Sequence, residues 1–302
     1  MTVASTQRHE LAEAAHVLAR LGLVTAFGHV SARTAGDRML ITPAADLATV
    51  TGSAILDVPL DARSLPAGAP AEAWAHLALY RARPDAGSVA RAQPASAFAA
   101  AAACPALVPL HGQAAWLGES VPVHDSARLL RSAELAERAA ASLPAGEALL
   151  LRGNGALTLG ASPGIAVARM WLLSAACETW LAARAAGNVT PLTAGEIASW
   201  RVAADELLPR LWQHLRRRAL GEVPAMEITD GRSAPADPQS RPVGDPADRA
   251  DPADPQIRMT RRYERPADTN DPERLRRERE DPGRDCRPRE HRHRPDVQAA
   301  PP

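Results

Sequence analysis

The sequence predicts one α/β domain in which helices cover the faces of a mixed sheet. Two observations lead to this fold class. Segments with apolar residues at helical spacing alternate with short β-type segments, and several of the β-type segments are joined by turns too short to hold a helix. Strands joined by short turns run antiparallel, so the sheet is not purely parallel. The chain has 302 residues, of which 46% are hydrophobic, which is enough for one large domain or two ordinary ones.

The composition changes near residue 220. Residues 221–302 hold fourteen of the 27 prolines, and Asp-Pro recurs there six times among many arginines. A segment with so few apolar residues cannot offset its chain entropy by packing. We therefore expect a folded domain over 1–220 and a disordered Pro/Arg/Asp-rich tail over 221–302.

Each expected element in the first part of the domain has a local signal. Residues 6–21 carry apolar side chains at helical spacing, and Gly22 is a suitable stop. Three β-type segments follow, the first with a glycine turn inside it and the second ended by a proline: 23–33, 38–45 and 54–60. A second helix is predicted over 70–83, because Pro70 suits a first helical turn and Pro84 stops the helix.

Residues 88–93, which read Ser-Val-Ala-Arg-Ala-Gln, form a short predicted strand that stops at Pro94. Side chains alternate along a strand, so Val89, Arg91 and Gln93 share one face. A cation and an amide on that face fit either an edge strand that meets solvent or a binding site.

The remaining elements follow from caps and turns. Ser132 is a suitable N-cap, Gly-Asn-Gly joins two strands, and Thr193 to Glu196 reads as a capping box. In chain order we expect a helix over 95–103, a strand over 106–110, a helix over 132–143, two strands over 148–160, a helix over 164–186 and a final helix from the capping box to Leu220.

Several functional classes are disfavoured by the sequence. The chain contains no lysine, so a lysine Schiff base is impossible. Walker, Rossmann and zinc-type cysteine motifs do not occur. The start shows no signal peptide and no apolar run reaches the ~18 residues of a membrane span. Three widely spaced cysteines suggest a reducing cytoplasm. We expect no nucleic-acid or membrane partner.

Four segments carry polar residues that packing alone does not require. Each also has a structural interpretation: a polar turn, a helical Glu–His pair, an edge strand and an ordinary Asn turn. The candidate residues are Gly28, His29 and Ser31 with Arg33; Glu72 and His76 on one predicted helix face with Tyr80; Arg91 and Gln93; and Asn154 between two glycines.

Taken in order, these segments resemble the class II aldolase/adducin family over about residues 5–220. The matching strings are LVTAFGHVSAR, MLITPAA, EAWAHLALYRARPDAGSVARAQP and LLLRGNGALTLG. Together with LHGQAAWLGESVPVHD they look most like the family's branch of hydroxyaromatic-acid decarboxylases. The resemblance implies a three-layer α/β/α domain with a mixed, largely antiparallel sheet. It also implies a homotetramer with active sites at subunit contacts.

The resemblance assigns roles to individual residues. Glu72 matches the family's catalytic acid/base, and Gly28 and His29 match the loop that holds the anionic end of the substrate. In the family, a His-x-His-Pro strand and a turn histidine bind a divalent metal; here those positions are Arg91, Gln93 and Asn154. Arginine cannot ligate a metal, and amide oxygens are poor ligands for zinc-like ions. We therefore predict no metal and no other cofactor.

Two hypotheses follow for this site. In the first, the chain is a carbon–carbon lyase for a small anionic keto- or hydroxy-acid. Arg91, Gln93 and Asn154 then form an anion pocket, Glu72 moves the proton, and the substrate is also held by Ser31, Thr42, His76 and His111. In the second, the chain is an inactive member of this fold that binds or scaffolds. Arg91 and Glu72 then form a buried ion pair in the cavity.

Overall fold

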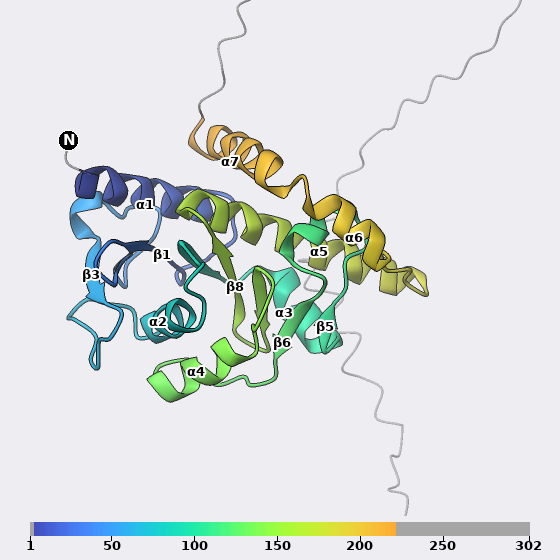
Figure 1. Cartoon of the computed structure of the whole chain (residues 1–302), viewed down its shortest axis with the longest axis horizontal. Coiled ribbons are helices and arrows are strands. Elements are labelled where there is room, and N and C mark those ends of the chain that lie inside the picture. The colour runs from blue at the N-terminus through green and yellow to red at the C-terminus, as the bar shows by residue number, and fades with distance from the viewer. Residues whose placement is uncertain (1–2, 222–302) are drawn as a thin grey trace, which may run out of the picture. The chain divides into compact units, whose positions relative to one another are not determined.

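The computed structural model describes residues 3–221, which fold into three layers, helices–sheet–helices (Figure 1). The predicted fold class is confirmed, including the mixed and largely antiparallel character of the sheet. The expected disordered tail over 221–302 lies outside the described residues, except for Gly221.

One sheet of eight strands forms the middle layer, in the order β3-β2-β1-β4-β8-β7-β6-β5. All neighbouring pairs are antiparallel except β6 and β7, which are parallel. The strands are β1 (His29–Thr34), β2 (Arg38–Ile41), β3 (Leu56–Pro59), β4 (Ser88–Ala92), β5 (Ala106–Leu107), β6 (Val121–His124), β7 (Ala148–Leu151) and β8 (Gly155–Gly160).

Strand β4 lies between β1 and β8, and all five of its residues are buried. The edge-strand interpretation of Arg91 is therefore wrong. Register pairs His29 with Arg91 and Arg91 with Leu157, so β4 brings the start of β1 next to the polar turn that precedes β8.

Helices cover both faces of the sheet and bury two separate apolar clusters against it. One cluster involves α1, α3, α5 and α7, and the other involves α2 and α4 (Figure 1). The helices are α1 (Val3–Arg20), α2 (Ala73–Ala82), α3 (Ala95–Ala103), α4 (Ala133–Ala141), α5 (Pro163–Ala186), α6 (Ala194–Arg201) and α7 (Ala204–Leu220), with short 3₁₀ segments at Gly52–Ala54 and Gly112–Leu117.

The predicted caps form as expected. The Ser132 hydroxyl accepts from the Leu135 amide, and Thr193 and Glu196 make a complete capping box at the start of α6. The single final helix predicted to Leu220 is wrong, since the chain breaks at 202–203 into α6 and α7. The break lets α6 cover the 3₁₀ segment, where the Trp116 indole N–H donates to the Trp200 carbonyl (2.9 Å). Such a long-range contact has no local signal.

Helix α5 has 24 residues and is apolar enough to meet a length-and-composition test for a membrane span. Twelve of its residues are buried, and the helix packs on β4, β8 and α3 in the larger apolar cluster. These contacts are those of a core helix in a folded domain.

Candidate functional site

A cavity of about 840 Å³ opens beside the end of β4 and contains most of the predicted site residues. That volume is in the range of small-molecule sites. Of the ten predicted residues, six line it: Gly28, His29, Glu72, Arg91, Gln93 and Asn154. Side chains from separate stretches of sequence thus converge on one space.

Glu72, Arg91 and Asn154 form a closed triangle of contacts in the cavity wall. Arg91 Nη2 lies 2.9 Å from Glu72 Oε2 and donates to Asn154 Oδ1 at 2.7 Å. Asn154 Nδ2 donates to Glu72 Oε1 at 3.1 Å. The Arg91 side chain is 1% exposed and that of Glu72 is 11% exposed. The pair is therefore a desolvated ion pair with an amide bridging its two charges.

Gln93 completes the arrangement when its amide oxygen is turned toward Arg91. In that orientation the oxygen accepts from the guanidinium, and the amide nitrogen donates to the Phe27 carbonyl. Both terminal nitrogens of Arg91 therefore have acceptors within the chain, whereas its buried Nε has none among the described residues. The prediction that its guanidinium would fork onto a substrate carboxylate has to be revised, because Nη2 already serves Glu72 and Asn154.

Two glycine positions allow this close approach. Gly155 has φ +85°, and a Cβ there would overlap the Ala92 carbonyl oxygen. A Cβ on Gly28 would overlap Val24 Cγ1 and press on the Arg91 carbonyl. The turn around Asn154 and the loop before β1 can therefore lie directly against the end of β4.

The sequence predicts that Glu72 and His76 share one face of a helix, and this prediction is wrong. Helix α2 begins at Ala73, so Glu72 is its N-cap residue. The Pro70 carbonyl accepts from the Ala73 amide in a turn, and Pro70 is therefore outside the helix. From the N-cap, the Glu72 carboxylate turns toward Asn154 and Arg91, where the positive end of the helix also favours its charge.

Ser31 and His76 lie behind the cavity wall and do not line it. Ser31 Oγ is 2.7 Å from His76 Nδ1 and 2.8 Å from the Tyr80 hydroxyl, and all three side chains are buried. The His76 ring meets the His29 ring edge-on at 5.9 Å. Ser31 and His76 are therefore not part of the cavity lining within this chain, and His76 packs against His29, which is.

Thr42 and His111 also do not line the cavity. The Thr42 hydroxyl accepts from the Val30 amide at 3.2 Å, so it fixes the backbone of β1. His111 precedes the 3₁₀ segment Gly112–Leu117 and is half-buried. The predicted substrate contacts of Thr42 and His111 therefore stay predictions, and within this chain neither side chain belongs to the cavity lining.

Burial sets the protonation of the two histidines. Desolvation, with a smaller repulsion from Arg91, lowers the pKa of His76 to about 3. Desolvation also lowers the pKa of His29 well below its ordinary value, and repulsion from His76 and Arg91 adds to it. Both rings are therefore neutral at pH 7. Desolvation lowers the pKa of Arg91 below its ordinary value, and the neighbouring Glu72 carboxylate offsets part of this shift.

These shifts predict a pH-dependent stability. Between pH 6.5 and pH 3 an unfolded chain binds a proton at His76 and the folded chain does not, so stability rises with pH in this window. Each such histidine contributes a slope of about 1.4 kcal/mol per pH unit. We expect urea titrations to show that the free energy of unfolding falls from pH 7.5 to pH 5. In His76→Asn the dependence of this free energy on pH should be smaller by the contribution of one histidine. An unchanged slope in the variant would contradict this assignment.

A divalent metal does not fit this arrangement. The described residues, 3–221, contain no group of three or more His, Cys, Asp or Glu side chains able to hold a metal ion. A metal at the triangle would also have to displace the Arg91 guanidinium, whose fixed charge repels cations. The donor chemistry present is suited to anions and hydrogen-bond acceptors.

Five larger side chains of the cavity wall had no prediction attached to them: Phe27, Asp46, Phe98, Leu129 and Arg131. One signal could have found two of them, because the chain has only two phenylalanines and both line the cavity. Arg131 has no such signal among so many arginines, since its position depends on where the loop before α4 lies.

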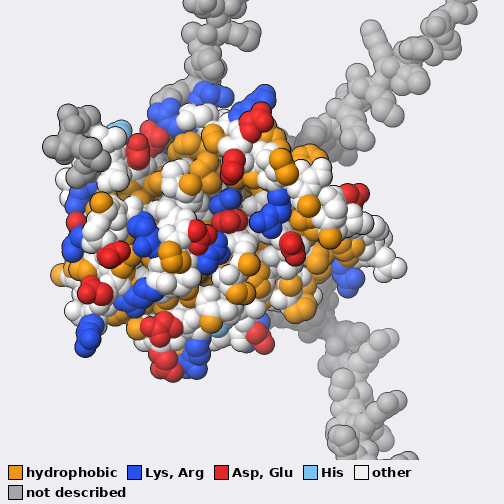
Figure 2. All heavy atoms as spheres, viewed as in Figure 1, with side chains coloured by type: hydrophobic (Ala, Val, Ile, Leu, Met, Phe, Trp, Pro, Cys, Tyr) orange, Lys and Arg blue, Asp and Glu red, His pale blue; other side chains and the backbone are white. Residues whose placement is uncertain are grey.

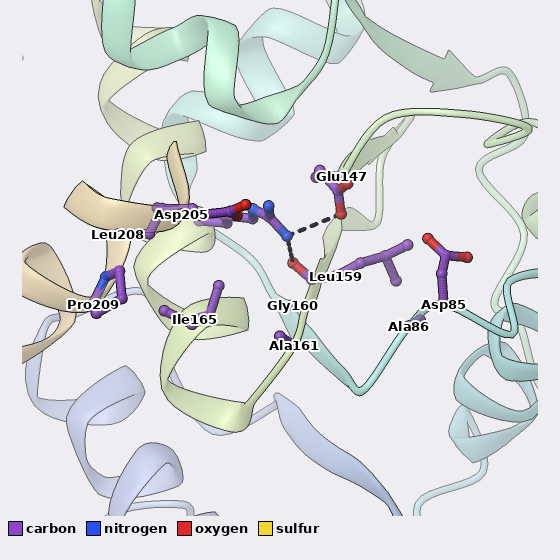
Figure 3. Close-up of a pocket in the computed structure, with 11 residues that line it drawn as sticks. Asp85, Ala86, Glu147, Leu159, Gly160, Ala161, Ile165, Asp205, Leu208 and Pro209 are labelled. Atoms are coloured by element: carbon purple, nitrogen blue, oxygen red, sulfur yellow. Dashed lines mark hydrogen bonds and ion pairs between the residues drawn. The ribbon is translucent and has the colours of Figure 1, made fainter. Parts of the chain in front are cut away.

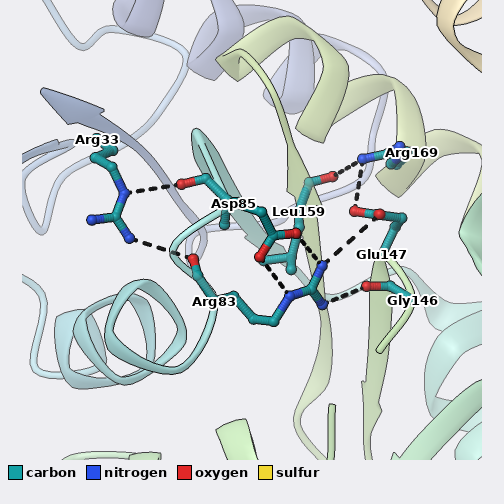
Figure 4. A network of polar contacts seen from close by, with 8 residues as sticks. Arg33, Arg83, Asp85, Gly146, Glu147, Leu159 and Arg169 are labelled. Atoms are coloured by element: carbon teal, nitrogen blue, oxygen red, sulfur yellow. Dashed lines mark hydrogen bonds and ion pairs between the residues drawn. The ribbon is translucent and has the colours of Figure 1, made fainter. Parts of the chain in front are cut away.

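A second, smaller cavity of about 270 Å³ shares no residue with the first (Figure 3). Among its charged groups, Arg169 Nη1 lies 2.9 Å from Glu147 Oε2. Asp85 Oδ2 lies 2.6 Å from Nη2 of Arg83, a residue outside the cavity lining (Figure 4). Arg33 joins this network by donating to backbone carbonyls (Figure 4). The network ties the turn before β4 to β7 and α5, so its role is structural.

The face seen in Figure 2 shows no large patch of a single charge sign. Arginine and acidic side chains are interspersed there, without a patch of one sign. Such a surface lacks the field that would concentrate a polyanion.

The chain is similar in sequence to known proteins. Residues 9–181 match the family model described as the Class II Aldolase and Adducin N-terminal domain. The chain is 31% identical over 204 residues to 3,4-dihydroxyphthalate decarboxylase of Terrabacter sp. (strain DBF63), covering 61% of this chain and 84% of that protein.

Two solved structures have the same fold. YgbL of Escherichia coli is 25% identical with a TM-score of 0.59, covering 66% of this chain and 100% of that one. The l-fuculose-1-phosphate aldolase of Thermus thermophilus is 27% identical with a TM-score of 0.55, covering 62% of this chain and 100% of that one. The family match over residues 9–181 includes every residue that lines the cavity.

Proposed function

The chain belongs to the class II aldolase and adducin family, and on that premise we propose that it is a carbon–carbon lyase acting on a small anionic hydroxy- or keto-acid. One observation carries the proposal. A carboxylate, Glu72, is held in a fixed orientation at the wall of a ligand-sized cavity by Arg91 and Asn154. A positioned carboxylate in a pocket is what general acid–base catalysis requires.

We further propose that this chain works without the divalent metal that its relatives would hold at this place. Arg91, Gln93 and Asn154 stand at the three matching positions, and the poor fit of a cation beside the Arg91 guanidinium supports this. In this proposal Arg91 is a positioning residue: it pairs with the Glu72 carboxylate and holds it at the cavity wall.

Glu72 then takes a proton from the substrate and later returns it to a different atom of the substrate. Its carboxylate accepts the proton of a substrate hydroxyl, and the bond to the departing carboxylate breaks to release CO₂. The electron pair of that bond remains on the substrate, in its ring or keto group. Glu72 returns the proton to the carbon that lost CO₂, and solvent later restores the hydroxyl. The neutral His29 beside the triangle can hydrogen-bond the substrate without adding charge.

Purified protein assayed in the presence and absence of EDTA tests this proposal. We expect CO₂ or aldehyde release from a panel of hydroxy- and keto-acids, including hydroxybenzoates, at the same rate with and without the chelator. Elemental analysis is expected to find no stoichiometric zinc or manganese. Activity that depends on added metal would contradict the metal-free site, and no release from any acid would contradict the lyase.

A second candidate, an inactive binding or scaffolding member of the family, is favoured by the closed Glu72–Arg91 pair. Its signature would be ligand binding at the cavity with no turnover. In either case we propose the homotetramer implied by the family, which would add a neighbouring subunit to the open side of the site.

A further inference from the structure

The charged side chains of the cavity wall differ in whether they have a partner within the chain. Glu72 and Arg91 compensate one another, and Asp46 accepts from the Ala48 amide at 2.9 Å. His29 is neutral. The guanidinium of Arg131, which is exposed and lines the same cavity, makes no hydrogen bond or ion pair with any residue that the structure describes. Arg131 is therefore the one uncommitted cation of this wall, within residues 3–221.

The wall beside Arg131 is apolar. Phe27 is 69% exposed, Leu129 is 48% exposed and Phe98 is 37% exposed, and all three line the cavity. The described residues contain five large exposed hydrophobic side chains, so most of them gather at this opening. Exposed apolar surface of this kind indicates a binding surface, and two aromatic rings suit a flat aromatic ligand.

The chemistry of decarboxylation decides which substrate group a free cation can hold. The carboxylate that leaves as CO₂ loses its charge in the transition state. A free guanidinium bound to that group would stabilise the ground state more than the transition state, and would slow the reaction. The same guanidinium bound to a carboxylate that stays on the substrate holds it equally in both states. A free cation is therefore useful only for the retained group.

We propose that Arg131 is the specificity-determining residue for a second, retained carboxylate of an aromatic dicarboxylate, whose ring lies against Phe27, Phe98 and Leu129. This inference rests on the proposed lyase function, which it deepens by naming the substrate class. Arg91 is unsuited to the role, because its charge is paired with Glu72 and both of its terminal nitrogens already have acceptors in Glu72, Asn154 and Gln93.

Equilibrium binding of phthalate and benzoate to the full-length protein tests the assignment. Phthalate carries the second carboxylate and benzoate lacks it. We expect wild type to bind phthalate about tenfold more tightly than benzoate, and Arg131→Gln to abolish this difference while leaving benzoate binding unchanged. Arg131→Lys is expected to restore part of the preference. Arg128→Gln, on the same loop but outside the cavity lining, should behave as wild type.

Kinetics provides an independent readout where a dicarboxylate is turned over. Arg131→Gln should raise KM about tenfold with little change in kcat, since it removes an interaction made equally in both states. Equal weakening of phthalate and benzoate binding, or no effect of Arg131→Gln, would overturn the assignment while leaving the lyase intact. Turnover of keto-acids by a wild-type protein that binds neither aromatic acid would overturn it as well. If the protein binds phthalate through Arg131 and releases no CO₂, the lyase proposal is contradicted and the assignment of Arg131 stands.

Discussion

Replacement of Glu72 by glutamine is expected to lower kcat by at least about 100-fold, which is the usual contribution of a positioned acid–base group. Glutamine cannot accept or return a proton. Its amide would also present N–H groups to Arg91 Nη2 or to Asn154 Nδ2, both of which donate to the carboxylate. The rate of CO₂ release by Glu72→Gln, measured at saturating substrate, checks this expectation.

Asp46→Asn is the matched control. Asp46 is a carboxylate in the same cavity that does not touch Arg91, and asparagine can still accept from the Ala48 amide. This variant should retain most of the wild-type kcat. Circular dichroism of Glu72→Gln below its melting temperature must show folded protein. A folded Glu72→Gln with wild-type kcat would remove Glu72 from the mechanism.

Replacement of Arg91 by leucine is expected to destabilise the fold by about 3 kcal/mol or more. The change leaves the Glu72 carboxylate desolvated without a counter-charge, and loss of one partner of a buried pair carries a cost of that size. It also removes the donor that Asn154 Oδ1 accepts from. Urea denaturation of wild type and Arg91→Leu at pH 7 measures the difference in free energy of unfolding.

An exposed ion pair of the same chemistry serves as the control. Arg38 Nε and Asp57 Oδ1 are 2.7 Å apart, with about two fifths of each side chain exposed. Arg38→Leu should cost less than about 1 kcal/mol. The double variant Arg91→Leu with Glu72→Gln should lose less than the sum of its single variants, because the orphaned charge is gone. Additive losses would mean that the two groups do not stabilise each other.

The two experiments together separate the two candidate functions. A lyase loses turnover with Glu72→Gln regardless of stability. An inactive binding protein has no turnover to lose, and there the pair contributes only to the folded state.

Local signals predicted most of the fold correctly. Caps at Ser132 and Thr193, the Gly-Asn-Gly turn and apolar periodicity gave helices and strands close to their observed bounds. They failed where a distant contact decides a boundary, as at the start of α2 and at the break between α6 and α7. Strand β6 was not predicted, since Pro122 lies within it and its place in the sheet depends on pairing with β7 and β5.

The sequence by itself determined part of the site, since six of the ten predicted residues line the cavity. The two-residue period of a strand turns Arg91 to the same face as Val89, and two glycines expose Asn154 in its turn. Only the tertiary structure decided what these groups do to one another. Asn154 and Glu72 are 82 residues apart in the chain and hydrogen-bond at 3.1 Å. Arg91 is compensated by Glu72 while Arg131 has no partner among residues 3–221, because distances between charges depend on packing, which no local pattern records.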